Sequence, residues 1–458
     1  MNDKDRRLLL SDAAARGIAY LNLLDQRPVF PGPEAVERLA RALDGPLPEG
    51  PAAADEVLAL IDQLGSPATV ANAGGRYFGF VTGGALPAAL AANWLAGAWD
   101  QNAFSRISSP AAALFEQAAL RWLKEALALP AEAEGALVTG ATMANFTALA
   151  AARHRVLAQA GWDVEARGLF GAPAIDVIVG EEVHGTVNKV LAMLGLGRER
   201  VTRVPVDREG RMRPDALPPI EGPTILCLQA GNVNSGAFDH APAIVPPARE
   251  RGAWVHVDGA FGLWARASRE QAALAEGLED ADSWAADGHK WLNVPYDCGI
   301  ALVRDPSALR AAMSISGAYL MSEGAETDVR DAIDVTPDSS RRARAIEVWA
   351  ALKSLGRSGL AELVERNCAQ ALRLSERLRE AGVEILNQVV LNQVVAAFGD
   401  DATTDRVLEA FQRDGTAWCG GTTWRNRRAM RISVSSWATT DEDIEKTVAA
   451  ILAARDEG

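Results

Sequence analysis

The first 70 residues place their apolar side chains with the spacing of an α-helix. Apolar residues recur every three or four positions in three segments, residues 6–24, 35–43 and 54–65, and Pro/Gly-rich joints separate these segments. The pattern predicts three short amphipathic helices. Such helices do not bury their apolar faces alone, so we expect them to pack against the rest of the chain or a second subunit.

A different pattern runs from about residue 80 to residue 350. Short apolar, β-branched runs alternate there with helical stretches such as residues 143–161 and 184–195. The runs are nearly continuous, as expected of strands covered on both faces, and the alternation predicts a mostly parallel sheet with right-handed crossovers. The seven runs are residues 135–140, 175–180, 201–207, 223–231, 253–260, 282–288 and 298–305.

The pattern changes again near residue 351. Helical and strand-like segments then follow in the order helix, strand, strand, helix, strand, helix. We therefore expect an N-terminal helical extension over residues 1–80, a large α/β domain over residues 81–350 and a small α+β domain over residues 351–458.

Charge and cysteine content narrow the class of protein. The 458 residues carry a formal net charge of -14, which argues against binding nucleic acid, because that requires a basic surface. No window reaches the roughly 18 uninterrupted apolar residues of a membrane helix. The four cysteines form no CxxC pair, so we expect reduced thiols, no metal site and a cytoplasmic location. They are Cys227, Cys298, Cys368 and Cys419.

Polar residues follow four of the predicted strands, at the sheet edge where open α/β proteins bind ligands. Residues 140–142 (Gly-Ala-Thr) join a strand to a helix, and a helix start of this kind attracts anions. His184, Asp258 and Lys290 each follow another strand. Singly, each has an ordinary structural explanation: a helix cap, a turn histidine, a capping aspartate or a lysine whose stem lies on apolar surface.

Together these residues fit one cofactor, pyridoxal 5'-phosphate (PLP). PLP requires an anion site for its phosphate, a carboxylate that keeps its ring nitrogen protonated and a lysine that holds its aldehyde as an imine. Residues 140–142, Asp258 and Lys290 provide these groups, and His184 adds an imidazole. A lysine against apolar surface has a lowered pKa, which frees its amine as a nucleophile.

Longer motifs strengthen this prediction, because they resemble the PLP-dependent group II amino acid decarboxylases, which have the aspartate aminotransferase fold (fold type I). The resemblance runs along nearly the whole chain. Its segments are GGRYFGFVTGGALPAALAANWL (residues 74–95), TGATMANFTALAAAR (139–153), HGTVNKVLAMLGLG (184–197), HVDGAFG (256–262), DGHKWLNVPYDCG (287–299) and SRRARAIEVWAALKSLG (340–356).

The resemblance implies a role for each matching residue. Lys290 corresponds to the lysine that forms the Schiff base, Asp258 to the partner of the pyridinium nitrogen and His184 to the imidazole stacked on the cofactor ring. Ala141 and Thr142 correspond to the phosphate-binding turn. The further cofactor contacts that it implies are Asn234, His289 and Ala260, a small residue that lets the ring lie flat against the protein.

The resemblance also implies the reaction: decarboxylation of an L-amino acid to an amine and CO2, in a homodimer with its active sites at the interface. Aromatic decarboxylases of this group carry a loop tyrosine that helps to protonate the α-carbon, and Ala332 stands at that position here, while Tyr319 matches another. A lyase or an aldehyde-forming decarboxylase–deaminase therefore stays open. Outside enzymes, so does a catalytically idle binding protein with this fold.

The substrate pocket of the family lies near the N-terminal aromatic segment. Tyr77, Phe78 and Phe80 would form walls suited to an aromatic or apolar side chain, although aromatic residues at this spacing also occur in protein cores. In related folds the small domain contacts a substrate carboxylate. The candidates for that role are Trp424, Arg425 and Arg431.

Overall fold

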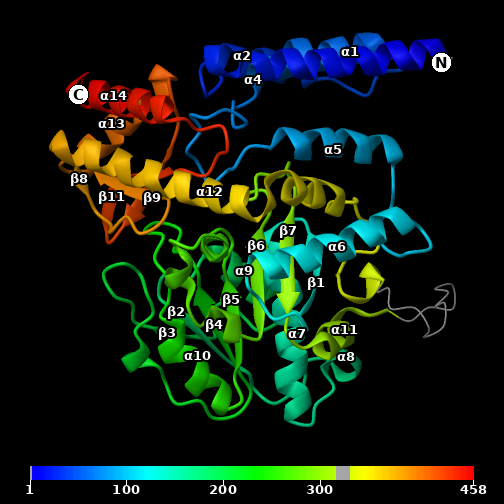
Figure 1. Ribbon diagram of the computed structural model, residues 1–458, viewed down its shortest axis with the longest axis vertical. Helices are drawn as coiled ribbons and strands as arrows, with labels where there is room; N and C mark the ends of the chain where they lie inside the picture. Colours follow the sequence, from blue (N-terminus) through cyan, green and yellow to red (C-terminus); the bar gives the residue numbers. More distant parts are fainter. Residues whose placement is uncertain (1–2, 316–330, 458) are drawn as a thin grey trace. The chain divides into compact units, whose positions relative to one another are not determined.

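The computed structural model describes residues 3–315 and 331–457, which form two compact units (Figure 1). The first unit comprises residues 1–82, 374–386 and 395–458, and the second comprises residues 83–373 and 387–394. The N-terminal segment and the C-terminal segment, which lie at opposite ends of the sequence, therefore belong to the same unit.

A seven-stranded sheet forms the centre of the second unit. Its order is β1-β7-β6-β5-β4-β2-β3, and β7 is antiparallel to both of its neighbours while β3, β2, β4, β5 and β6 run parallel. The mostly parallel α/β fold is thereby confirmed. The strands are β1 (Glu134–Val138), β2 (Asp176–Gly180), β3 (Val201–Val204), β4 (Thr224–Gln229), β5 (Trp254–Asp258), β6 (Ser283–Asp287) and β7 (Gly299–Val303).

Helix α7 (Ala141–Gln159) packs against β5, β6 and β7. Its sequence is rich in alanine and contains neither glycine nor proline, which favours a helix, and its small side chains allow close contact with the sheet. Eleven of its residues are buried, and seven of them, all apolar, join residues of the strands in one core. The other helices of this unit are α5 (Pro87–Trp99), α6 (Pro110–Ala126), α8 (Val164–Arg167), α9 (Gly185–Met193), α10 (Ala241–Glu250) and α11 (Pro306–Met313).

Helix α12 (Ala345–Glu380) carries the chain from the second unit into the first. The sequence pattern predicts a helix only over residues 359–382. The observed helix begins earlier, at Ala345. Gly356, whose backbone is not helical (φ 61°), separates this first part from the predicted segment.

The first unit contains a four-stranded sheet of order β10-β11-β9-β8 with α13 and α14. Residues 76–78 join this unit through backbone hydrogen bonds: Phe78 N–H donates to Trp418 O at 2.7 Å, and Trp418 N–H donates to Arg76 O at 3.1 Å. The elements are β8 (Glu384–Ile385), β9 (Gln393–Ala397), α13 (Asp401–Asp414), β10 (Gly420–Trp424), β11 (Arg427–Ser433) and α14 (Asp441–Glu457).

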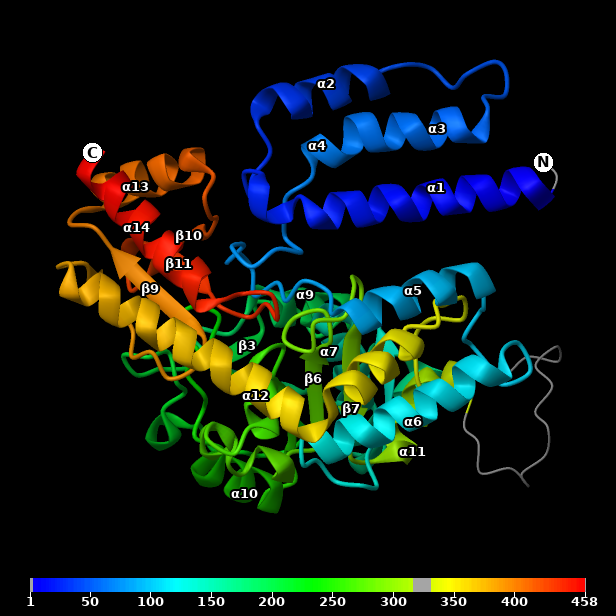
Figure 2. The same cartoon turned by 45° about the horizontal axis from the view of Figure 1, so that its top comes forward.

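The N-terminal helices of the first unit lie side by side in Figure 2. They confirm the helical N-terminal segment expected from the sequence. None of their side chains is buried, and Leu8 and Leu10 on α1 are 60% and 62% exposed. These helices are α1 (Asp3–Asn22), α2 (Pro33–Leu43), α3 (Ala54–Leu60), which continues as a π-helical turn over Ile61–Gly65, and α4 (Ser66–Ala68).

Candidate active site

Strand β6 ends at a buried aspartate that organises the residues after it. All five residues of β6 are buried, and the turn at Gly288 brings His289 and Lys290 back to the strand end. Lys290 Nζ lies 3.3 Å from one carboxylate oxygen of Asp287, and His289 Nε2 lies 3.4 Å from the other. The amine predicted to lie against apolar surface is therefore ion-paired, and it also lies 5.8 Å from the centre of the Phe261 ring.

The protonation of His289 follows from its hydrogen bonds. Its Nδ1 accepts the backbone N–H of Cys298 at 3.0 Å, so the proton of the neutral ring is on Nε2, which faces Asp287. Burial lowers the pKa of His289, and Lys290 lowers it further, while Asp287 raises it. The ring also stacks on Tyr296, with 4.3 Å between centroids. His289 is thus a fixed, neutral donor next to the lysine.

The start of helix α7 lies at the same place. Gly140 is its N-cap residue, with extended backbone and no side chain of its own to cap the helix, and Thr142 lies inside the helix, so the alternative of Thr142 as an ordinary cap is wrong. The backbone N–H of Ala141 instead donates to Asp287 Oδ1 at 2.6 Å. The helix start and Lys290 therefore share a single carboxylate.

Asp258, at the end of β5, is a second buried carboxylate of this region. Among the described residues its side chain accepts one hydrogen bond, a long one of 3.3 Å from the backbone N–H of Ala260. Burial raises the pKa of Asp258, whereas His184 and Lys290 lower it and Asp287 raises it. His184 and Lys290 are thus close enough to Asp258 to act on its charge.

His184 and Asn234 come from two further loops of the second unit. His184 is the N-cap of α9: its Nδ1 accepts the backbone N–H of Thr186 at 3.3 Å and lies 2.7 Å from the Thr186 hydroxyl. The proton of its neutral ring is therefore on Nε2. Asn234 is buried, and its backbone N–H donates to Asn232 Oδ1 at 2.9 Å.

Two residues of the site were missed by sequence reasoning. Asp287 ends a buried strand in the same way as Asp258, and this shared position was the signal that could have identified it. The second is Gly83, where any side chain would overlap the carbonyl oxygen of Lys290. A close backbone approach of this kind requires glycine.

The predicted substrate residues lie in the first unit. Tyr77 stacks on Trp418 with 5.1 Å between centroids, and Phe80 is 61% exposed. Phe78 is buried, as is Trp424, whose indole nitrogen has no hydrogen-bond partner within residues 3–315 and 331–457. Burial lowers the pKa of Arg431.

The described residues of the second unit fit PLP. A buried carboxylate with one long hydrogen bond suits a cationic ring nitrogen, and the start of α7, which already binds a carboxylate at Ala141 N–H, suits a phosphate. Lys290 supplies a primary amine beside both groups. Within the described ranges, 3–315 and 331–457, no helix has the length and apolar character needed to cross a membrane.

The chain was compared with known proteins. Residues 38–398 match the family model described as the pyridoxal-dependent decarboxylase conserved domain. An L-2,4-diaminobutyrate decarboxylase of Rhizobium meliloti (strain 1021) is 31% identical over 385 residues, 80% of this chain and 75% of the relative. An aromatic-L-amino-acid decarboxylase of Bacillus atrophaeus is 26% identical over 392 residues, 81% of this chain and 79% of the relative.

Solved structures show the same fold. The crystal structure of Oryza sativa TDC with PLP and tryptamine superposes with a TM-score of 0.90 at 23% identity, covering 100% of this chain and 99% of that chain. The family match covers most of the sequence, and the half-buried lysine, the carboxylates and the helix start agree with it. The chain belongs to the pyridoxal-dependent decarboxylase family and is a PLP-dependent carboxy-lyase that acts on an amino acid.

Proposed function

We propose that this enzyme converts an L-amino acid into the corresponding amine and CO2, with Lys290, Asp258 and His184 as its catalytic residues. The observation that carries the proposal is the grouping of Lys290 and Asp258 with the start of α7 at the carboxyl ends of the sheet strands. The bound cofactor supplies an electron sink for the pair of electrons that remains when CO2 leaves.

In this proposal each residue has one task. Lys290 holds the cofactor covalently through its amine, and Asp258 holds a proton at the cofactor's ring nitrogen. A buried carboxylate performs this task well because its charge is little screened by water. His184 lies against the cofactor ring, while Ala141 and Thr142 bind the phosphate. The remaining cofactor contacts are Asn234, Ala260 and His289.

Covalent labelling tests the assignment of Lys290. Borohydride should reduce the PLP-loaded enzyme and leave a stable adduct on the peptide that contains Lys290, detected by mass spectrometry. Lys290→Ala should give no adduct and an unchanged circular dichroism spectrum. The matched control is Lys189→Ala, since Lys189 is exposed on α9 of the same unit and its loss should leave the adduct intact. An adduct on another lysine would refute the assignment.

The product also needs a test, because no phenol stands at the position of the family's loop tyrosine. Ala332 is buried there and begins a short 3-10 turn, and Tyr319 lies outside the described residues. A methyl side chain cannot donate a proton, which keeps the aldehyde-forming reaction as the second candidate. CO2 with a matching amine would establish simple decarboxylation, and aldehyde with peroxide would establish the oxidative reaction.

For the substrate side chain we propose an aromatic or apolar group that contacts Tyr77, Phe78 and Phe80, with Trp424 and Arg431 in contact with the substrate as well. The exposed ring of Phe80 and the stacked ring of Tyr77 support this class. A panel of aromatic, aliphatic, acidic and basic amino acids should show the highest kcat/KM for an aromatic member. Phe80→Ala should raise KM for that member more than for alanine.

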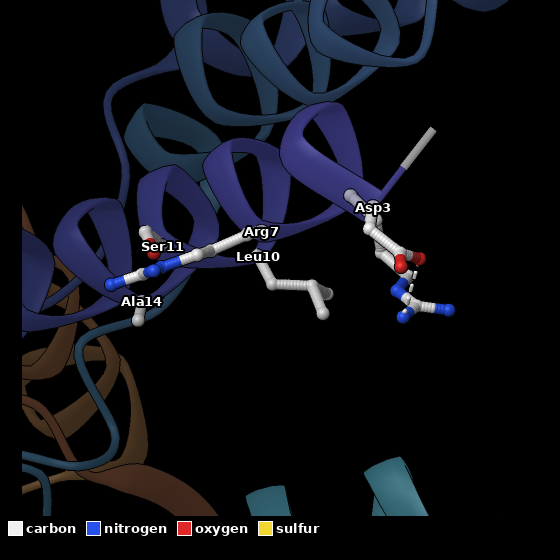
Figure 3. Close-up of a pocket in the computed structure, with 6 residues that line it drawn as sticks. Asp3, Arg7, Leu10, Ser11 and Ala14 are labelled. Carbon is white, nitrogen blue, oxygen red and sulfur yellow. Dashed lines mark ion pairs between the residues drawn. The ribbon is translucent and has the colours of Figure 1, made fainter. Parts of the chain in front are cut away.

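We further propose a homodimer in the cytoplasm, with the N-terminal helices packed against the partner. The exposed apolar residues of α1 support this, and Figure 3 shows Leu10 projecting from that helix beside Ala14. The free, buried cysteines are consistent with a reducing compartment. Light scattering should report a dimer, and Leu8→Glu with Leu10→Glu should shift it towards monomer. A monomeric wild-type enzyme would refute the dimer.

A further inference from the structure

The carboxylate of Asp287 occupies the position that an anion takes at a helix start. Its Oδ1 accepts the backbone N–H of Ala141 at 2.6 Å, at the first residue of α7. The unpaired N–H groups and the dipole of a helix start favour negative charge. In this structure the negative charge at the start of α7 belongs to the chain itself.

Asp287 is held firmly in this position. Its side chain is 4% exposed, its backbone N–H donates to Ala260 O at 2.8 Å, and its carbonyl oxygen accepts Trp264 Nε1–H at 3.0 Å. Its second carboxylate oxygen lies 3.3 Å from Lys290 Nζ. The same aspartate therefore contacts both the proposed phosphate site and the proposed covalent anchor.

Gly140 makes this arrangement possible. A Cβ atom at residue 140 would lie 3.3 Å from His289 Cε1 and 3.5 Å from Asp287 Oδ1. A larger side chain would consequently press on both residues and leave less room at the helix start. The glycine thus keeps the start of α7 open to a carboxylate or a phosphate.

We propose that Asp287 is a positioning residue that competes with the cofactor's phosphate for the start of α7 and pairs with Lys290 until the cofactor binds. The proposal rests on the roles given above to Lys290 and residues 140–142. Two anions that approach the same N–H group repel each other strongly in a site shielded from water. The charge of Asp287 therefore weakens phosphate binding, and its removal should strengthen it.

The test compares PLP with pyridoxal, which carries the same aldehyde and ring but no phosphate. The full chain, freed of cofactor, is titrated with each compound and binding is followed by absorbance. Asp287→Asn should raise the ratio of PLP affinity to pyridoxal affinity by about tenfold or more. Any effect of the lost ion pair on the Lys290 amine acts on both compounds and cancels in this ratio. An unchanged or lower ratio would overturn the proposal.

Asp282→Asn is the matched control. Asp282 precedes β6 at the opposite end of the strand, accepts the backbone N–H of Val255 at 2.9 Å and pairs with Arg249 at 3.2 Å. Its loss removes a partly buried carboxylate of the same unit away from Lys290. The ratio should keep its wild-type value in this variant. If the affinity ratio rose equally in both variants, the change in net charge alone would explain the rise, and the proposed role of Asp287 would be refuted.

A second measurement does not involve the lysine chemistry. Inorganic phosphate should raise the melting temperature of cofactor-free Asp287→Asn or Asp287→Ser more than that of wild type, with chloride at equal ionic strength as the reference. Equal shifts of the melting temperature in wild type and variant would contradict the proposal. Asp287→Ser replaces Asp287→Asn in this measurement if the asparagine variant does not fold. If wild type forms no adduct at Lys290, the proposed function fails. An adduct with an unchanged ratio refutes only the competition.

Discussion

Two buried polar clusters lie next to each other on β5 and β6, and they serve different purposes. In the first, both ring nitrogens of His256 are hydrogen-bonded, Nδ1 to Ser283 at 2.9 Å and Nε2 to Asn145 at 2.8 Å. Asp258, two residues further along β5, accepts one long hydrogen bond. Both ring nitrogens of His256 are thus satisfied by side chains of the protein, whereas the Asp258 carboxylate keeps most of its hydrogen-bonding capacity for the proposed cofactor.

The pKa shifts show the same contrast. Burial lowers the pKa of His256 to about 3, which fixes the ring as neutral. Burial raises the pKa of Asp258, but the nearby groups His184, Lys290 and Asp287 also change it. Interacting titratable groups of this kind are typical of active sites, whereas a single buried histidine with two partners is typical of a core. Both residues are buried, so their position distinguishes the two clusters: Asp258 lies at the end of β5, and His256 lies within the strand.

The largest expected effect comes from Lys290. Lys290→Ala should reduce kcat/KM by roughly 10³-fold or more, because the covalent anchor and the amine are lost together. The fold should persist, since the lysine contributes one ion pair and its side chain is 20% exposed. Steady-state kinetics and thermal melting measure the two effects. Residual activity near that of wild type would place the chemistry elsewhere.

Asp258→Asn should lower kcat by about 10²- to 10³-fold, because an amide cannot hold a charge at the cofactor ring. The cofactor-free variant should be at least as stable as wild type. Since burial raises the pKa of Asp258, the native state binds the proton more tightly than the unfolded state, and ionisation at neutral pH costs stability. If the variant instead lost stability and kept its activity, Asp258 would have a structural role, as His256 has, and no catalytic role.

His256→Gln should leave kcat per folded molecule unchanged and lower the free energy of unfolding by about 1–3 kcal/mol. The wild type should lose about 2 kcal/mol between pH 6.5 and pH 5, because the unfolded histidine gains a proton that the buried ring does not accept. The variant should lack this loss. Urea unfolding at both pH values measures it, with His240→Gln as the exposed control.

Trp254→Phe should have the smallest effect. Trp254 Nε1–H donates to Ser283 Oγ at 2.8 Å, so its removal takes one hydrogen bond from the His256 cluster. We expect a loss of about 1 kcal/mol in urea unfolding with normal kinetics. A fall in kcat for this variant would show that the two clusters are coupled.

Much of the second unit could be predicted, because its strands are short apolar runs and its helices have regular periodicity. The seven strands and α7 follow this pattern. Helix α10 was missed, and it contains Pro246 and Pro247, which disfavour a helix interior. Strand β10 was missed because it begins with two glycines, which are rare in strands.

Local periodicity and residue type were enough to predict the order of the elements, the polar groups at the strand ends and the cofactor that those groups fit. Which groups meet could not be predicted in this way: Ala141 contacts Asp287, 146 positions further on, and Arg76 contacts Trp418. Such contacts form when distant elements pack together in the folded chain, so neither partner reveals the other in the sequence.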